Sequence, residues 1–360
     1  MTPRTSILVA FIAFASTSLL GQDAGPRLPP AAADPRPASV SSPDDPGLAA
    51  LIATCRVPPA PRGGGRGGGQ PPGPRAYQVG AIDGVIAAGQ RWRFLWQEAG
   101  NNGDGIVGTD DGGLLIAQND NSKVVKLDAS GRPSVVYSDT HTGGSLSMNA
   151  KGALFVVQRG LRTGILQLTP RRVVLANRYQ GDVLDCIGGN PNDLTADSRG
   201  GVYFTMGGLY YADAAGLVTK YGENLATNGV ILSGDEKTLY VTNGPTLVAF
   251  DVRPDGSLVN QRTFARLEGG GNGDGSTIDA AGRIYVTTNP GVQVIDRDGK
   301  YLGLIPTPRP VISVAFGGRE KRTLFVLARG ATEANGTEIA NAAQVYTIET
   351  IARGFAGRAK

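Results

Sequence analysis

The chain repeats one short pattern: a polar loop, a strand, a tight turn and a second, apolar strand. The apolar cores return at intervals of roughly 37 to 48 residues, about the size of one four-stranded propeller blade. Six cores keep this phase, at residues 114–117, 154–157, 202–205, 239–242, 284–287 and 324–327. The repeat predicts an all-β fold, a six-bladed β-propeller over residues 79–355. A β-sandwich, the main alternative, would not explain the constant phase.

Composition agrees with this fold and limits the function. The 360 residues include 53 glycines, which suits many short strands joined by tight turns. A strand near residues 91–97 or 343–348 is expected to close the ring. The net charge of +4 is mild, and no basic stripe is interleaved with aromatic residues. We therefore expect no nucleic-acid partner, and we expect a monomer.

The first 78 residues are predicted to lie outside the propeller. Residues 1–22 have the pattern of an export signal, since Arg4 precedes an apolar run that is too short for a membrane span. Residues 23–78 form a Pro/Gly-rich linker that cannot bury enough apolar surface to fold, with a short docking helix expected near 47–55. We expect an exported protein, periplasmic or extracellular, with no membrane span after signal removal. An uncleaved N-terminal anchor is the alternative.

The chain contains two cysteines, Cys55 and Cys186. In an oxidising compartment such a pair can form a disulfide, which would tie the tail to the loop before Asn192. The alternative is two independent thiols, because the sequence alone does not show that the two sulfurs meet.

One position of the repeat carries oxygen-bearing side chains. Asn192 lies eight residues before the turn glycine Gly200, and Asp274 lies eight residues before Gly282. In a propeller the innermost strands line the central channel, so side chains in this phase converge at one mouth. In chain order the position is filled by Asp104, Gly144, Asn192, Asn228, Asp274 and Ser313.

Four of these residues are candidate metal ligands: Asp104, Asn192, Asn228 and Asp274. Two carboxylates and two amide oxygens are the hard donors that Ca²⁺ or Mg²⁺ prefers. We expect a divalent cation, first Ca²⁺, with Mg²⁺, Mn²⁺ or Zn²⁺ as alternatives. The single histidine, His141, excludes a zinc site built on several histidines. Each ligand alone could instead cap a hairpin, but four in one phase favour a site.

The segments around these positions resemble the signature blocks of a known family. The blocks are Pro-Asn-Asp-Leu at 191–194, Thr-Asn-Gly-Val at 227–230, Gly-Asp-Gly at 273–275 and Val-Ala-Phe-Gly-Gly at 314–318. They look like the senescence marker protein, gluconolactonase and luciferin-regenerating enzyme family. The resemblance implies a six-bladed propeller with a divalent cation, commonly Ca²⁺, in the channel, and hydrolysis of lactones or related esters. It also implies metal ligation by Asn192, Asn228 and Asp274.

Two residues depart from the pattern of that family. The first-blade ligand is normally glutamate, whereas Asp104 is one methylene shorter, so a water molecule is an alternative to direct ligation. The family often has arginine two residues before the third-blade asparagine, where it helps to hold sugar acids. Here Asn190 stands in that place, which weakens the case for gluconolactone as substrate.

The mechanism expected from these residues is metal-assisted hydrolysis. The cation would polarise a lactone carbonyl, and Asp274 is the predicted catalytic base that accepts the proton of the attacking water. Asn190, His141 and Ser313 are candidate substrate-binding residues. A Gly-x-Ser-x-Gly elbow, the mark of many serine hydrolases, is absent from the sequence. The alternatives are an aryl-ester or organophosphate hydrolase using the same ion, and an exported, non-catalytic propeller that binds a carbohydrate or a protein.

Overall fold

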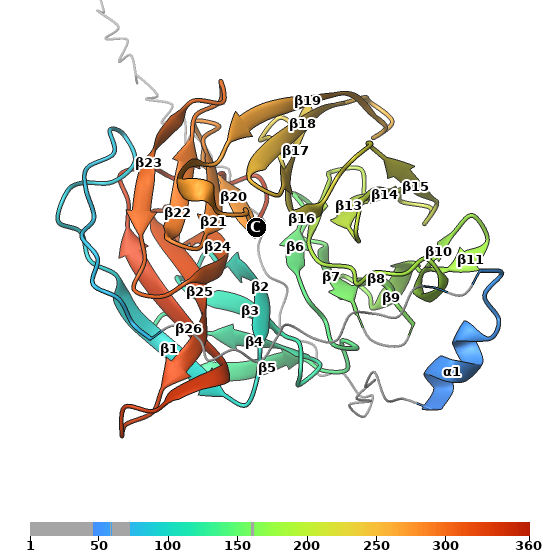
Figure 1. Ribbon diagram of the computed structural model, residues 1–360, viewed down its shortest axis with the longest axis horizontal. Helices are drawn as coiled ribbons and strands as arrows, with labels where there is room; N and C mark the ends of the chain where they lie inside the picture. Colours follow the sequence, from blue (N-terminus) through green and yellow to red (C-terminus); the bar gives the residue numbers. More distant parts are fainter. Residues whose placement is uncertain (1–45, 58, 60–72, 160–161) are drawn as a thin grey trace, which may run out of the picture.

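The computed structural model describes residues 46–57, 59, 73–159 and 162–360. The predicted signal peptide, residues 1–22, and most of the predicted linker, residues 23–78, lie outside these residues. The described chain is almost entirely β and forms six four-stranded antiparallel sheets around one central axis (Figure 1). The six-bladed propeller predicted from the repeat is confirmed.

Five blades are built from four consecutive strands, beginning with the strand nearest the channel. Blade 1 consists of β2 (Gly103–Gly108), β3 (Leu114–Gln118), β4 (Lys123–Leu127) and β5 (Pro133–Tyr137). Blade 2 consists of β6 (Leu146–Met148), β7 (Leu154–Gln158), β8 (Gly164–Gln167) and β9 (Val173–Ala176). Blade 3 consists of β12 (Leu194–Ala196), β13 (Val202–Thr205), β14 (Leu209–Ala212) and β15 (Val218–Tyr221). Blade 4 consists of β16 (Thr227–Leu232), β17 (Thr238–Asn243), β18 (Thr246–Val252) and β19 (Leu258–Arg266). Blade 5 consists of β20 (Ser276–Ile278), β21 (Ile284–Thr288), β22 (Gly291–Ile295) and β23 (Tyr301–Pro306).

Blade 6 joins the two ends of the ring. Its inner three strands are β24 (Val311–Gly317), β25 (Thr323–Thr332) and β26 (Glu338–Glu349), and its outer strand is β1 (Arg93–Ala99). β1 pairs antiparallel with β26, the cyan and orange-red strands that lie side by side in Figure 1. Both stretches expected to close the ring take part, as partners of each other. The inner strand β24 of blade 6 contacts β2 of blade 1, so the first and last blades pack against each other and the ring is closed.

The repeated apolar cores are the second strands of the blades. β3, β7 and β13 are buried along their whole length, because each sheet packs face to face between two neighbours. This explains why they read as continuous apolar runs rather than as an alternating pattern. The turn before each of them needs a positive φ, as at Gly200 (φ 95°), a conformation that favours glycine.

Two further segments pack against the ring. Before β1, residues such as Val85, Ile86 and Trp92 join a buried cluster with side chains of blades 5 and 6. After β26, residues 350–360 enter the channel, where Ala359 pairs with Met148 of β6. Figure 1 places the end of this segment in the middle of the ring. Contacts with the ring therefore continue to Lys360.

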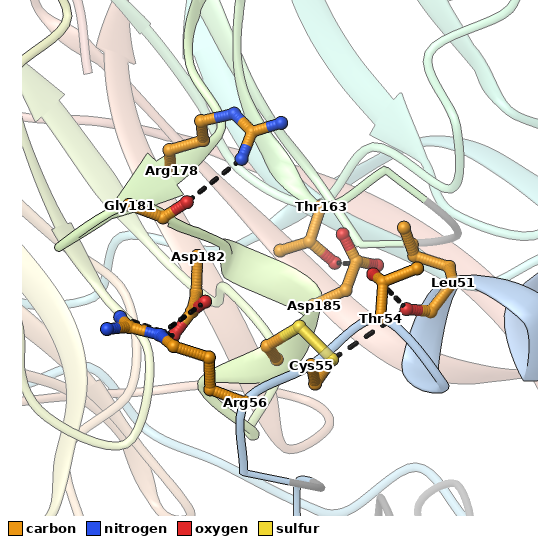
Figure 2. The surroundings of a disulfide bond; sticks show 10 residues. Leu51, Thr54, Cys55, Arg56, Thr163, Arg178, Gly181, Asp182 and Asp185 are labelled. Carbon is orange, nitrogen blue, oxygen red and sulfur yellow. Dashed lines mark hydrogen bonds and ion pairs between the residues drawn. A yellow bond between two sulfur atoms is a disulfide. The ribbon is translucent and has the colours of Figure 1, made fainter.

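A disulfide ties the residues after an outlying helix to the connection between blades 2 and 3. The helix α1 (Pro46–Ile52) overlaps the stretch near 47–55 where a docking helix was expected. Cys55 is bonded to Cys186 of the short helix η1 (Leu184–Cys186), with their Cα atoms 5.4 Å apart. Figure 2 shows Arg56 beside this bond, donating to Asp182 Oδ1 at 2.9 Å. Of the two alternatives left open by the sequence, the structure contains the disulfide.

The remaining short elements complete the fold. A two-stranded hairpin, β10 (Arg178–Tyr179) and β11 (Asp182–Val183), leads into η1, and η2 (Glu268–Gly270) precedes β20. None of the helices in the described part of the chain is long and apolar enough to cross a bilayer.

Candidate functional site

The predicted ligands stand at one end of the inner strands. Asp104 lies in β2 and Asn228 in β16, while Asn192 and Asp274 come just before β12 and β20. Each inner strand contacts the next one around the ring, so their equivalent ends surround one mouth of the channel. Asp104 is buried, whereas the other three side chains are partly exposed. The mouth therefore presents polar groups to solvent.

Backbone contacts hold the inner strands of neighbouring blades close together at this mouth. Gly105 N donates to Gly144 O at 2.9 Å, and Gly275 N donates to Ile312 O at 3.0 Å. At Gly229 a Cβ atom would lie 2.1 Å from Asp274 O, closer than real atoms approach. Glycine after Asn228 thus lets blade 4 come against the backbone of Asp274. This explains why an asparagine and a glycine occur together at that position of the repeat.

Three of the predicted ligands are joined through an arginine that the sequence analysis missed. Arg159 Nη1 lies 2.5 Å from Asp104 Oδ2, and Nη2 donates to Asn192 Oδ1 at 2.7 Å. Asn192 Nδ2 in turn donates to Asn228 Oδ1. Asp104, Asn192 and Asn228 are therefore brought together in one polar cluster, and the backbone of Asp274 lies against Gly229, the residue after Asn228.

The three candidate substrate-binding residues have different surroundings. Asn190 is exposed. Ser313 is buried, and its hydroxyl accepts from Ile106 N at 3.3 Å, so it links blade 6 to blade 1. His141 Nε2 lies 3.7 Å from Asp139 Oδ1, and its carbonyl oxygen accepts from Arg159 N at 3.1 Å. Of the three, Asn190 is the most accessible.

A second charged pair lies behind the mouth. Asp193 follows Asn192 directly, and its Oδ2 accepts from Val230 N at 2.8 Å and from Lys360 Nζ at 2.6 Å. Lys360 Nζ also donates to Leu194 O at 2.5 Å and to Val230 O at 2.6 Å. Burial lowers the pKa of Lys360, an effect that Asp193 opposes. This interaction was also missed, because no local pattern connects residue 360 with residue 193.

The four predicted ligands offer oxygen atoms of the kind that a hard divalent cation binds. Two carboxylates and two amide groups supply oxygen ligands of the kind that Ca²⁺ prefers. In the described part of the chain no group of three or more His, Cys, Asp or Glu side chains is arranged to hold a metal. A cation there would need the asparagines as well as the aspartates. Two of the four side chains, Asp104 and Asn192, are already engaged by Arg159.

A closed six-bladed propeller that gathers aspartate and asparagine side chains at one channel mouth is the architecture of a recognised class of proteins. Residues 139–329 match the family model described as the SMP-30/Gluconolactonase/LRE-like region. The chain belongs to this family, and the resemblance noted in the sequence is confirmed.

Curated relatives cover part of the chain. Pentonolactonase XacC of Haloferax volcanii is 32% identical over 154 residues, 39% of this chain and 53% of that protein. Lactonase drp35 of Staphylococcus saprophyticus is 29% identical over 191 residues, 45% of this chain and 56% of that protein. The chain thus spans about half the length of the curated relatives that it matches.

Solved structures share the fold over a larger part of the chain. The gluconolactonase XC5397 from Xanthomonas campestris superposes with a TM-score of 0.62 at 22% identity, covering 79% of this chain and 99% of that one. Regucalcin from Agrobacterium tumefaciens, described as a calcium-binding protein, gives 0.59 at 20% identity, covering 73% and 96%. At these identities the likeness shows the fold alone.

Proposed function

We propose that this protein hydrolyses a lactone or a related ester at the channel mouth. The observation that carries the proposal is the polar cluster of Asp104, Asn192 and Asn228 with Asp274 on the adjoining blade. Membership of the SMP-30/gluconolactonase family, and relatives named pentonolactonase and lactonase, support the same reaction.

The three residues of the cluster, Asp104, Asn192 and Asn228, together with Asp274 would hold a divalent cation, first Ca²⁺. When bound, such a cation polarises the carbonyl of the substrate. Asp104 is buried and supplies charge, while Asn192 and Asn228 are partly exposed and would supply amide oxygens from blades 3 and 4. The asparagines add ligands without adding negative charge. The cation would therefore keep more of its positive charge for the carbonyl oxygen of the substrate.

Asp274 is the proposed general base. Asp274 is partly exposed at the mouth, where a water molecule would be activated. In the proposed step Asp274 takes a proton from the water that attacks the lactone carbonyl, and the ring carbon–oxygen bond then breaks. The protonated Asp274 would pass this proton to the leaving alkoxide, which regenerates the carboxylate and gives a hydroxy acid as the product. General base catalysis of this kind contributes about 10²–10⁴-fold to a rate.

Asn190 at the exposed rim is the proposed substrate contact. Because its amide is neutral, it would hydrogen-bond a hydroxyl-bearing lactone rather than pair with a carboxylate. His141 and Ser313 already have contacts within the fold and are weaker candidates for this role.

A substrate panel tests the proposal. Purified protein supplied with Ca²⁺ would be given aldonolactones, aryl esters and phosphotriesters, and acid release would be followed by pH-stat titration. We expect the highest kcat/KM with lactones. Turnover of aryl esters or phosphotriesters alone would show that the substrate class is wrong.

A non-catalytic propeller that binds a carbohydrate or a protein is the second candidate. One observation favours it: Arg159 pairs with Asp104 and donates to Asn192. Such contacts are expected at a former metal site whose ligands no longer bind an ion. Absence of turnover across the panel, together with saturable binding of a carbohydrate or protein ligand, would support this alternative.

We also propose that the protein is exported and acts as a monomer. The disulfide between Cys55 and Cys186 supports export, because such bonds persist in oxidising compartments. Cell fractionation with sequencing of the mature N-terminus, and light scattering of the purified protein, would test these two points.

A further inference from the structure

Arg159 reaches the channel mouth through a space that the sequence leaves empty. It follows β7 directly, and its backbone N–H donates to His141 O at 3.1 Å. Gly144 fills the blade 2 position of the repeat, where blades 1 and 3 carry Asp104 and Asn192. A Cβ atom at Gly144 would lie 2.3 Å from both Cζ and Nε of Arg159. The guanidinium therefore occupies the volume that a blade 2 ligand would otherwise fill.

The guanidinium is held from several sides. Nε donates to Pro191 O at 2.7 Å, and Nη2 donates to Asn192 O at 2.8 Å and to Asn192 Oδ1 at 2.7 Å. Nη1 pairs with Asp104 at 2.5 Å. With the Asn119 amide turned so that both of its ends find partners, its oxygen accepts from Nη1 at 3.0 Å. The planar fork of donors thus matches its acceptors closely, which is the arrangement that arginine favours.

These contacts place a positive charge beside the proposed cation ligands. Asp104 Oδ2 and Asn192 Oδ1 are two of the oxygens that the cation would need, and both accept from Arg159. Asp104 and Asp274 together carry two negative charges, of which the guanidinium neutralises one. A divalent ion at the same oxygens would be repelled by the guanidinium at close range. Cation and guanidinium therefore compete for the same ligands.

We infer that the guanidinium of Arg159 acts as a resident cation, which means that it occupies oxygens that a divalent ion would use. A divalent ion would then bind to all four ligands only when the guanidinium releases Asp104 and Asn192. This inference rests on the proposed function, since it concerns the same centre. It assigns a role to Gly144 as well: the missing side chain leaves room for the guanidinium.

Calcium titration by calorimetry tests the inference on the folded, chelator-treated protein. Arg159→Gln removes the charge and retains a polar side chain. Charge-assisted hydrogen bonds of this kind are strong enough that we expect Ca²⁺ to bind Arg159→Gln about 10–100-fold more tightly than the wild type. Arg159→Lys keeps the positive charge but loses the fork of donors, so its Ca²⁺ affinity should lie between those of the wild type and Arg159→Gln. Arg171→Gln, an exposed arginine of the same blade, is the matched control and should not change the affinity.

Thermal unfolding gives a second readout. Without Ca²⁺, Arg159→Gln should have a lower Tm than the wild type, because Asp104 loses its counter-charge. Saturating Ca²⁺ should raise the Tm of this variant more than that of the wild type. If Arg159→Gln is too unstable to study, Gly144→Ala keeps the charge but crowds the guanidinium, and it should also tighten Ca²⁺ binding.

The outcomes separate this inference from the proposed function. Equal or weaker Ca²⁺ binding by Arg159→Gln and Gly144→Ala, with lactone turnover by the wild type, overturns the role of Arg159 alone. If neither the wild type nor these variants binds Ca²⁺, Mg²⁺ or Mn²⁺, both the resident-cation role and the divalent centre are wrong.

Discussion

The ammonium group of Lys360 lies 2.6 Å from Asp193 Oδ2 inside the channel, and both side chains are less than one-tenth exposed. Asp193 adjoins the predicted ligand Asn192, and its other oxygen accepts from Leu194 N at 2.9 Å. The pair therefore connects the segment 350–360 with the strand that carries the site. Removing one partner of a buried ion pair leaves the other charge unpaired at a high cost in free energy. Residues 350–360, which carry Lys360, should therefore contribute to the stability of the propeller.

Breaking this pair should destabilise the protein strongly. Lys360→Met leaves the Asp193 carboxylate buried without its counter-charge, which costs about 3–5 kcal/mol. Urea unfolding would measure the loss. In the double variant Asp193→Asn, Lys360→Met the loss should be smaller than the sum of the two single losses, because neither charge is left alone. A Lys360→Met protein of wild-type stability would show that the pair does not form.

Asp274→Asn tests the proposed base. We expect kcat for the best lactone to fall about 10²–10⁴-fold, with Ca²⁺ binding measured alongside to separate loss of the base from loss of the cation. Asp298→Asn is the control, since that carboxylate is 81% exposed in a turn of blade 5, and it should leave kcat unchanged. Full activity of Asp274→Asn with Ca²⁺ bound would exclude Asp274 as the base.

Removing the disulfide should lower stability and release the outlying helix. The bond between Cys55 and Cys186 spans 131 residues, and loss of a native crosslink costs about 2–4 kcal/mol. The double variant Cys55→Ser, Cys186→Ser should unfold at a lower Tm than the wild type, by the same amount as reduced wild type. It should also be cut by proteases near α1 while the blades stay intact. An unchanged Tm would mean that the bond does not form in solution.

Buried tyrosines predict alkaline unfolding. Burial raises the pKa of Tyr203, Tyr211 and Tyr285 above the ordinary value of 10.0, and the hydroxyl of Tyr285 donates to Asp279 Oδ2 at 2.9 Å. A raised pKa in the folded state means that the folded chain holds its protons longer than the unfolded chain. The stabilisation is complete below pH 10 and is lost as pH rises further.

The measurement is Tm against pH, with tyrosinate absorbance recorded in the same samples. We expect Tm to fall above pH 10 and the tyrosinate signal of these residues to appear together with unfolding. Tyr203→Phe should make the fall of Tm with pH above pH 10 less steep. Titration of all eleven tyrosines near pH 10 in the folded protein would contradict the assignment.

The propeller could be predicted because its signal is local and repeated. Each blade needs an apolar second strand behind a glycine turn, so six copies in one phase are sufficient to count the blades. The same phase placed Asp104, Asn192, Asn228 and Asp274 at equivalent ends of the inner strands. The sequence left open which stretch closes the ring, because β1 and β26 are distant in sequence and no local pattern shows that they pair.

Arg159 and Lys360 could not be predicted in the same way. Both act through long side chains that reach across blades, and neither lies in the repeated position. The one signal for Arg159 was indirect. Gly144 is the repeat position without a side chain, and the structure shows that another side chain fills its space. Lys360 has no such signal, because its segment lies outside the repeat and follows the last strand.

The central claim is that the oxygen cluster at the channel mouth hydrolyses lactones with the help of a divalent cation. Its most direct test is lactone turnover by protein stripped with a chelator, before and after Ca²⁺ is restored, with the metal content measured in each sample. We predict that stripping abolishes turnover, that Ca²⁺ restores it, and that Asn228→Ala needs a higher Ca²⁺ concentration for the same rate. Undiminished turnover by metal-free protein would contradict the account.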